Sequence, residues 1–261
     1  MARDEGEVGL RLDGRWAVVT GGSKGIGLGI AERLAEAGAN LVLVARDEGD
    51  LAAARAHLGQ VAPDAEVVTR SVDVVDTRAV DELFADLETT IGSLDVFVAN
   101  AGSGKVTPFL EIPLEEWRWT LDLNLTGVFY PCQLAAQRMV REPRQRDRCL
   151  LVVSSVRARG VRAGRLSYAV AKAGVNQFVR AAALELAEHR IRVNAVSPGI
   201  TATPLTERNP EIFAATAATV PLGRAGEPSD MARAALFLCS PAARFVTGEN
   251  MLVDGGEHLL G

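Results

Sequence analysis

Two side chains that can share a proton stand four positions apart in the second half of the chain. Tyr168 and Lys172 lie in the segment S-Y-A-V-A-K, which has helical period, so they share one helix face. A free phenol has a pKa of about 10, and a neighbouring ammonium lowers that pKa toward neutral pH. The same spacing also fits an exposed helical contact. Composition favours the chemical interpretation, because the chain has only 2 tyrosines and 3 lysines.

A serine stands thirteen positions before this tyrosine. Ser155 ends the apolar run L-V-V-S-S, and the carboxyl ends of parallel strands are where α/β sheets bind ligands. Its hydroxyl could hold a carbonyl oxygen while Tyr168 gives that oxygen a proton. A Ser-Ser pair at the end of a strand is also ordinary strand-to-loop chemistry.

A glycine-rich turn follows the first apolar run near the N-terminus. The segment T-G-G-S-K-G-I-G over 20–27 has the spacing G-x-x-x-G-x-G rather than G-x-G-x-x-G. Glycines allow a tight turn and a close approach to a pyrophosphate, which the free N–H groups of the next helix stabilise. Such a turn can also simply connect a strand to a helix without binding a ligand. The expected strand before it and helix after it favour dinucleotide binding.

The end of the second apolar run bears on the choice of dinucleotide. An acidic residue there would accept bonds from the ribose of NAD, but the run L-V-A-R ends in Arg46. Arg46 could clamp a 2′-phosphate and Lys24 could add a second positive charge. Both could instead be solvated surface charges, and Asp47 follows directly. The sequence therefore favours NADP(H) over NAD(H).

Strand-length apolar runs alternate with longer segments of helical period along the chain. This alternation predicts an α/β fold, a Rossmann-like doubly wound parallel sheet of about seven strands with helices on both faces. Strands are expected at 16–20, 40–45, 66–72, 94–100, 149–154, 192–197 and 250–253, and helices at 27–37, 77–91, 117–140 and 166–189. No linker divides the chain, so we expect one domain over 1–261, with a loose leader at 1–13 and an irregular substrate lid at 204–221.

Composition narrows the class of protein. The 261 residues are 48% hydrophobic and carry a formal charge of −5, and this acidic balance argues against nucleic-acid binding. No apolar stretch approaches the roughly 18 residues that a membrane helix needs. The beginning of the chain lacks a signal core, and the 3 cysteines and 3 histidines are scattered. We therefore expect a cytoplasmic protein with neither a membrane partner nor a metal site.

The combination of these motifs resembles the short-chain dehydrogenase/reductase family, in its single-domain branch with T-G-x-x-x-G-x-G. Further family motifs stand in the same order: D-V at 73–74, N-A-G at 100–102, N-L-T-G at 124–127, P-G at 198–199, V-T-G at 246–248 and V-D-G-G at 253–256. The resemblance covers roughly residues 12–256, and none of its core motifs is broken.

The resemblance implies hydride transfer between a nicotinamide and a carbonyl or alcohol carbon. Tyr168 would be the general acid/base, and Lys172 would lower its pKa and bind the nicotinamide ribose. Ser155 would orient the substrate carbonyl, and Asn124 would hold the water of a proton relay. With the glycine turn, Lys24 and Arg46, the predicted cofactor site comprises Gly21, Ser23, Lys24, Gly25, Ile26, Gly27, Arg46, Asp73, Val74, Asn100, Ala101, Gly102, Tyr168, Lys172, Pro198, Gly199, Thr201 and Thr203. Family members are commonly homotetramers.

Arginines supply the only local indications of substrate. Four of them lie between Ser155 and Tyr168, and Arg157 or Arg159 could enter the cleft and pair with a carboxylate or phosphate of the substrate. Solvated or interface arginines are the more ordinary interpretation. A second basic stretch over 138–148 could meet an acidic carrier protein that delivers a 3-oxoacyl chain, or could be a solvated helix end.

Three kinds of function stay open at this point. The sequence favours an NADP(H)-dependent carbonyl reductase or alcohol dehydrogenase with a small-molecule substrate, and a 3-oxoacyl thioester reductase is the specific alternative. A non-catalytic NADP-sensing regulator on the same fold would usually have lost the tyrosine or the lysine. An enzyme that keeps the cofactor but performs dehydration or epimerisation is the third.

Overall fold

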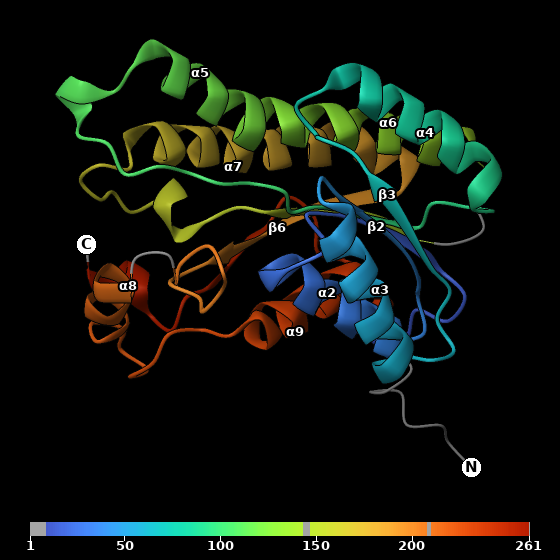
Figure 1. Ribbon diagram of the computed structural model, residues 1–261. Coiled ribbons are helices and arrows are strands. Elements are labelled where there is room, and N and C mark those ends of the chain that lie inside the picture. Colours follow the sequence, from blue (N-terminus) through green and yellow to red (C-terminus); the bar gives the residue numbers. More distant parts are fainter. Residues whose placement is uncertain (1–8, 143–146, 208–209, 261) are drawn as a thin grey trace.

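Seven parallel strands form one sheet in the computed structural model, which describes residues 9–142, 147–207 and 210–260 (Figure 1). The strand order is β3-β2-β1-β4-β5-β6-β7. The strands are β1 (Trp16–Thr20), β2 (Asn40–Ala45), β3 (Val67–Ser71), β4 (Val96–Ala99), β5 (Arg148–Val153), β6 (Ile191–Pro198) and β7 (Asn250–Val253). The order reverses at β1, which pairs with both β2 and β4, and such a switch point is where open α/β sheets bind ligands.

Helices cover both faces of the sheet, and this confirms the predicted Rossmann-like architecture (Figure 1). One face carries α2 (Gly25–Glu36), α3 (Glu48–Val61) and α9 (Pro228–Cys239). The other carries α4 (Thr77–Thr90), α6 (Gly127–Arg141) and α7 (Leu166–Leu186), with α5 (Leu114–Leu121) packed beside α7. Inner strands such as β2 are nearly continuous Val, Leu and Ala runs because both of their faces are buried, whereas the edge strands β3 and β7 are only half-buried.

The predicted helix over 117–140 is wrong as a single element. It is interrupted by a π-helical turn at Asp122–Thr126, which separates α5 from α6. Such a turn inserts one residue into the helical register and is frequent at functional sites. Hydrophobic periodicity alone did not reveal it, because the apolar pattern continues on both sides.

Two segments outside the regular alternation are more ordered than expected. The predicted lid contains the helix α8 (Pro210–Ala217), which lies near the C-terminal end of the described chain (Figure 1). In the predicted leader, Leu12 is fully buried and its N–H donates to the carbonyl of Ala37. Residues 1–8 of that leader lie outside the described residues. Within the described ranges, no helix is both long and apolar enough to cross a bilayer.

Candidate active site

Tyr168 and Lys172 lie on the first two turns of α7, against the end of β5. Lys172 is buried, and its Nζ lies 5.6 Å from the centroid of the Tyr168 ring. The same Nζ donates a hydrogen bond of 2.8 Å to the carbonyl oxygen of Val153. The ammonium is therefore fixed between the strand and the phenol instead of extending into solvent.

Burial shifts the ionisation of both groups. It lowers the pKa of Lys172 to about 8. It also raises the pKa of Tyr168, while a hydrogen bond with Ser155 and the positive charges of Arg165 and Arg157 act in the opposite direction. The phenol is thus protonated at neutral pH and can serve as a proton donor.

The two serines that end the β5 run have different roles. Ser154 donates a 2.6 Å hydrogen bond to Oδ1 of Asn176, which braces α7 against the sheet. Ser155 is buried, and its Oγ accepts a 3.1 Å hydrogen bond from the N–H of Arg157. Ser155 is therefore the serine that contacts the phenol of Tyr168.

Asn124 lies on the π-helical turn and is fully buried. Its Oδ1 accepts from the N–H of Ser103, and its Nδ2 donates to the carbonyls of Ser103 (2.7 Å) and Thr120 (2.9 Å). A methyl group added at Gly102 would lie 2.8 Å from Oδ1 of Asn124 and 3.6 Å from Nζ of Lys172. The fold therefore brings Asn124, Lys172, Tyr168 and Ser155 to one end of the sheet.

The glycine turn after β1 has the geometry that a bound dinucleotide requires. Gly21 and Gly25 have positive φ angles of 63° and 54°. An added Cβ at Gly27 would stand 2.1 Å from the carbonyl oxygen of Gly21. Asn100, after β4, holds the turn by donating to the carbonyls of Thr20 and Gly21.

The N-terminus of α2 points its free N–H groups at this turn. Its N-cap residue, Lys24, makes no side-chain cap, and the first turn holds no acidic residue. An added Cβ at Gly25 would lie 3.3 Å from the side chain of Thr203, so the loop after β6 faces the turn. Uncapped N–H groups, a partial positive charge and backbone without side chains fit a pyrophosphate.

The residues expected to choose between NAD and NADP are paired with acids. Lys24 lies 2.7 Å from a carboxylate oxygen of Asp50, and exposed Arg46 lies 3.7 Å from one of Asp73. Asp47 caps α3 by accepting a 2.8 Å hydrogen bond from the N–H of Asp50. The carboxylate that follows Arg46 is thus occupied in the helix cap.

The loop after β6 is held by the C-terminal segment. An added Cβ at Gly199, just after Pro198, would lie 2.7 Å from Oε2 of Glu257, and that oxygen accepts a 2.7 Å hydrogen bond from the N–H of Ile200. Thr201 is buried and donates to the carbonyl of Gly199. Glu257 was not predicted from the sequence, because a single glutamate has no diagnostic spacing.

The remaining predicted cofactor residues are distributed around this edge. Val74 is buried, and its side chain would lie 3.2 Å from a Cβ added at Gly127 on α6. Asp73 accepts from the N–H of Val75. The backbone of Ala101 is tied to Thr20 Oγ1 by a 3.1 Å bond, while Ser23 and Ile26 are half-buried in the glycine turn and first turn of α2.

The structure changes the interpretation of both arginine stretches. Arg157 forms an ion pair with buried Glu257, so its charge is already matched, whereas Arg159 is exposed. In the second stretch, Arg138 and Arg148 are buried and share the carboxylate of Glu142. They are not available to a carrier protein. Positions 144 and 146 of that stretch lie outside the described residues.

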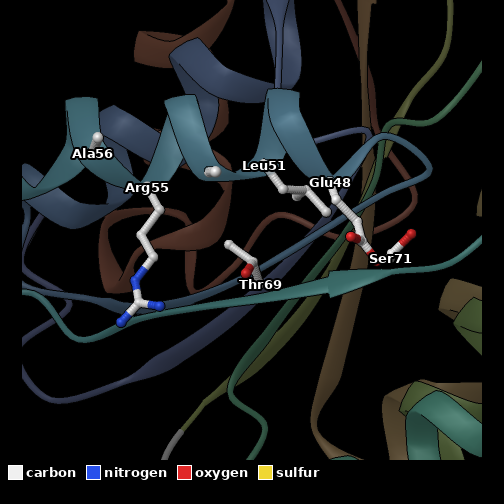
Figure 2. A pocket seen from close by; sticks show the side chains of 7 residues that line it. Glu48, Leu51, Arg55, Ala56, Thr69 and Ser71 are labelled. Carbon is white, nitrogen blue, oxygen red and sulfur yellow. The ribbon is translucent and has the colours of Figure 1, made fainter.

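A groove of about 540 Å³ lies away from these residues, between α3 and β3 (Figure 2). It is lined by Glu48, Leu51, Ala52, Arg55, Ala56, Thr69 and Ser71. A second cavity, of about 240 Å³, lies beside the arginine loop and is lined by Arg157, Arg162, Ala215, Thr216, Thr219, Glu257 and Leu260. One residue of the second cavity, Arg157, contacts a candidate catalytic residue, because its N–H donates to Oγ of Ser155.

Comparisons with known proteins agree with this geometry. Residues 21–258 match the family model described as enoyl-(acyl carrier protein) reductase. The chain is 34% identical to a 3-oxoacyl-(acyl-carrier-protein) reductase of Vibrio harveyi, over 96% of this chain and 100% of the relative. It is 36% identical to a 3α-hydroxysteroid dehydrogenase of Mediterraneibacter gnavus, over 95% of this chain and 99% of the relative.

Solved structures extend the likeness to three dimensions. A 7α-hydroxysteroid dehydrogenase complexed with NADH and 7-oxo glycochenodeoxycholic acid has a TM-score of 0.89 and 33% identity, over 95% of this chain and 96% of that chain. A dehydrogenase/reductase of Mycobacterium marinum has a TM-score of 0.90 and 33% identity, over 95% and 97%. The protein is an oxidoreductase that acts on CH–OH or C=O groups with a nicotinamide cofactor. The chain belongs to the short-chain dehydrogenase/reductase family.

Proposed function

We propose that the protein is an NADP(H)-dependent carbonyl reductase whose proton donor is the hydroxyl of Tyr168. The observation that carries this proposal is the cluster of half-buried Tyr168 with buried Lys172 and Ser155 at the end of β5, beside the glycine turn. When bound, the nicotinamide would supply or accept the hydride.

The chain's own residues would handle the carbonyl oxygen. Ser155 would donate a hydrogen bond to that oxygen and hold it near the phenol. Tyr168 would pass its proton to the same oxygen in reduction and remove it in oxidation. Because the tyrosine is half-buried, bound substrate and cofactor would limit the access of bulk water to this proton.

Lys172 would act on the proton donor and on the cofactor ribose. Its ammonium lies against the ring of Tyr168 and stabilises a phenolate by its charge. The hydrogen bond to Val153 uses one of its three N–H donors and leaves the others for the ribose hydroxyls. Asn124 would keep the 102–103 backbone in place beside Lys172.

The preference for NADP(H) rests on Lys24 and Arg46. Their ion pairs with Asp50 and Asp73 involve exposed side chains, and such pairs contribute only about 0–1 kcal/mol each. A doubly charged 2′-phosphate can therefore displace the carboxylates. The capping role of Asp47 supports the same preference, because it engages the nearest carboxylate that could bind an NAD ribose.

The substrate is a small molecule with a carbonyl or secondary alcohol, and a 3-oxoacyl thioester is the specific alternative. The Vibrio relative, named as a 3-oxoacyl-(acyl-carrier-protein) reductase, favours the alternative. Burial of Arg138 and Arg148 removes one surface that a carrier protein could have used. The retained Tyr168 and Lys172 count against a regulator without activity.

The proposal also covers the oligomeric state of the protein and its cellular compartment. We expect a homotetramer, supported by exposed apolar side chains at Phe129 on α6, Leu184 on α7 and Phe245, which is 100% exposed in the single chain. The three free, buried cysteines fit a reducing cytoplasm. Light scattering of the purified protein measures the assembly.

A cofactor-oxidation screen tests the proposed function. The purified protein is offered NADPH or NADH with a panel of aldehydes, ketones, anionic ketones and 3-oxoacyl thioesters, and absorbance of the reduced cofactor is followed. We expect ketone-dependent oxidation of NADPH, slower with NADH. Cofactor binding without turnover of any carbonyl or alcohol would support the regulator instead.

A further inference from the structure

We propose that the cavity between the 155–165 loop, α8 and the C-terminal turn binds a carboxylate carried by the substrate, through Arg162 and Arg165. This inference rests on the proposed function for the identity of the reacting group, a ketone at Tyr168. It adds the substrate class: a keto acid whose carboxylate is held away from the carbonyl.

The cavity is built from three separate parts of the chain. The loop after Ser155 supplies Arg157 and Arg162, the lid helix α8 and the residues after it supply Thr216 and Thr219, and the C-terminal turn supplies Glu257. Its volume is about 240 Å³, which holds a small acidic group but not a large apolar one. Polar and charged side chains dominate this lining.

Arg162 spans the cavity from the loop to the lid. Its Nη1 donates a 2.8 Å hydrogen bond to Oγ1 of Thr216, which is buried and in turn donates to the carbonyl of Ile212. A guanidinium has five N–H donors, and this contact uses one of them. Within the described ranges, no carboxylate pairs with Arg162.

Arg165 is half-buried and lies beside the proton donor, outside the residues that line the cavity. Its Nη1 donates to the carbonyl of Gly104 at 3.3 Å, and an added Cβ at Gly104 would lie 2.9 Å from the ring of Tyr168. Arg165 and the Tyr168 ring therefore flank the same glycine. In the described part of the chain, Arg165 also lacks a carboxylate partner.

The local charge is unbalanced. Arg157, Arg162 and Arg165 lie close enough for the first two to lower the pKa of Arg165, together with its burial, which is the larger cause. Among the residues that the structure describes, the carboxylate that pairs with this group is Glu257, which is engaged by Arg157 and by the N–H of Ile200. Three guanidinium groups against one carboxylate leave a net positive charge, and an anionic ligand would relieve their repulsion.

This assignment differs from the sequence-based hypothesis in the residues that it names. Arg157 is a positioning residue, because its ion pair with Glu257 connects the Ser155 loop to the loop after β6. Arg159 is exposed and does not line the cavity, whereas Arg162 lines it and half-buried Arg165 lies beside Tyr168. Arg162 and Arg165 provide the guanidinium donors that lack a carboxylate, and carboxylates accept such donors in bidentate pairs.

Paired ligands that differ only in charge test the assignment. The probes are 4-oxopentanoate, 5-oxohexanoate and 6-oxoheptanoate, each with its methyl ester, so that the spacing between ketone and carboxylate is varied. Binding is measured by calorimetric titration of the protein saturated with NADP⁺, in which the ketones cannot be reduced. Turnover with NADPH is measured separately.

The ratio of acid to ester affinity is the readout. In the wild type, we expect at least one acid to bind about 10- to 100-fold more tightly than its ester. Arg162→Gln and Arg165→Gln should bring this ratio close to one, and Arg162→Lys should restore part of it. Arg159→Gln, on the same loop, is the matched control and should keep the wild-type ratio. Melting temperatures establish that each variant is folded.

The two proposals fail in different ways. Acids that bind no better than esters across the series, or an equal loss of the ratio in Arg159→Gln, would overturn the carboxylate site while ketone turnover leaves the proposed function standing. Preferred binding of an acid through Arg162 and Arg165, with no turnover of any carbonyl by either cofactor, would keep the site and overturn the proposed function.

Discussion

The ammonium of Lys172 donates a 2.8 Å hydrogen bond to the main-chain carbonyl of Val153, two residues before Ser155. One bond thus joins the helix that carries the proton donor to the strand whose end carries the second hydroxyl of the site. The buried ammonium is held at a fixed position beside the ring of Tyr168. Its charge state should therefore affect both stability and catalysis.

Replacing Lys172 by methionine removes the titrating group, so a comparison with the wild type at several pH values isolates the effect of its ionisation on stability. Burial lowers the pKa of Lys172 to about 8, below its usual 10.5, so between these values the unfolded chain binds a proton that the folded chain has released. The free energy of unfolding of the wild type should rise with pH across this window relative to Lys172→Met. Urea titrations at pH 7.5, 9 and 10.5 measure the difference. A constant difference across the three pH values would contradict this ionisation.

Gly27→Ala should disrupt the dinucleotide turn. Its Cβ would stand 2.1 Å from the carbonyl oxygen of Gly21 and 2.4 Å from Nδ2 of Asn100, so the backbone must move. We expect a loss of about 1–3 kcal/mol in the free energy of unfolding and at least a tenfold weaker cofactor affinity, measured by urea titration and calorimetry.

Gly59→Ala is the matched control for this substitution. Gly59 lies within α3, and an added Cβ meets nothing within 4 Å. The same chemical change should leave cofactor affinity intact and stabilise the helix by about 0.5–1 kcal/mol. Equal losses of cofactor affinity in the two variants would show that the close approach at Gly27 is not the cause.

Glu142→Gln should destabilise the fold far more than an exposed counterpart. Glu142 neutralises Arg138 and Arg148, whose side chains are 3% and 6% exposed. Its loss takes the paired carboxylate from buried Arg138 and one carboxylate contact from buried Arg148, at a cost of about 3–5 kcal/mol. Glu82→Gln, which breaks the exposed pair with Arg78, should change stability by less than about 0.5 kcal/mol. Urea titration compares them, and similar small effects would argue against the buried network.

Arg46→Ala combined with Lys24→Ala should reverse the cofactor preference. Loss of both positive charges removes the groups that would bind the 2′-phosphate, so KM for NADPH should rise at least tenfold while KM for NADH changes little. Arg55→Ala, which removes an exposed positive charge from α3 outside the predicted cofactor residues, is the control. A wild-type enzyme that prefers NADH would contradict the role given to Lys24 and Arg46.

Much of the fold could be predicted from the sequence. Buried parallel strands consist of continuous apolar runs, so β1, β2 and β7 begin and end where the sequence predicts. The ends of β3 and β4 were predicted too long. At β4, Asp95 directly precedes the strand, and its side chain accepts a hydrogen bond from the N–H of Trp16 while its own N–H donates to the carbonyl of Trp16.

The rest depends on contacts between residues far apart in the chain. The π-helical turn that carries Asn124 has no apolar signature, and the pairing of Arg157 with Glu257 joins positions 100 residues apart. Sequence spacing also made Arg138 and Arg148 look like a basic surface, because it could not show that Glu142 neutralises them inside the fold. Local pattern predicts elements and short motifs, whereas charge pairing across elements requires the structure.

If the hydroxyl of Tyr168 gives its proton to the substrate carbonyl, removing that hydroxyl alone should stop the reaction. The most direct measurement is kcat for NADPH-dependent ketone reduction by Tyr168→Phe, with cofactor affinity measured by calorimetry alongside. We expect kcat to fall about 10²- to 10⁴-fold while NADPH binds within about threefold of the wild-type affinity. Turnover at the wild-type rate by Tyr168→Phe would contradict this proton transfer.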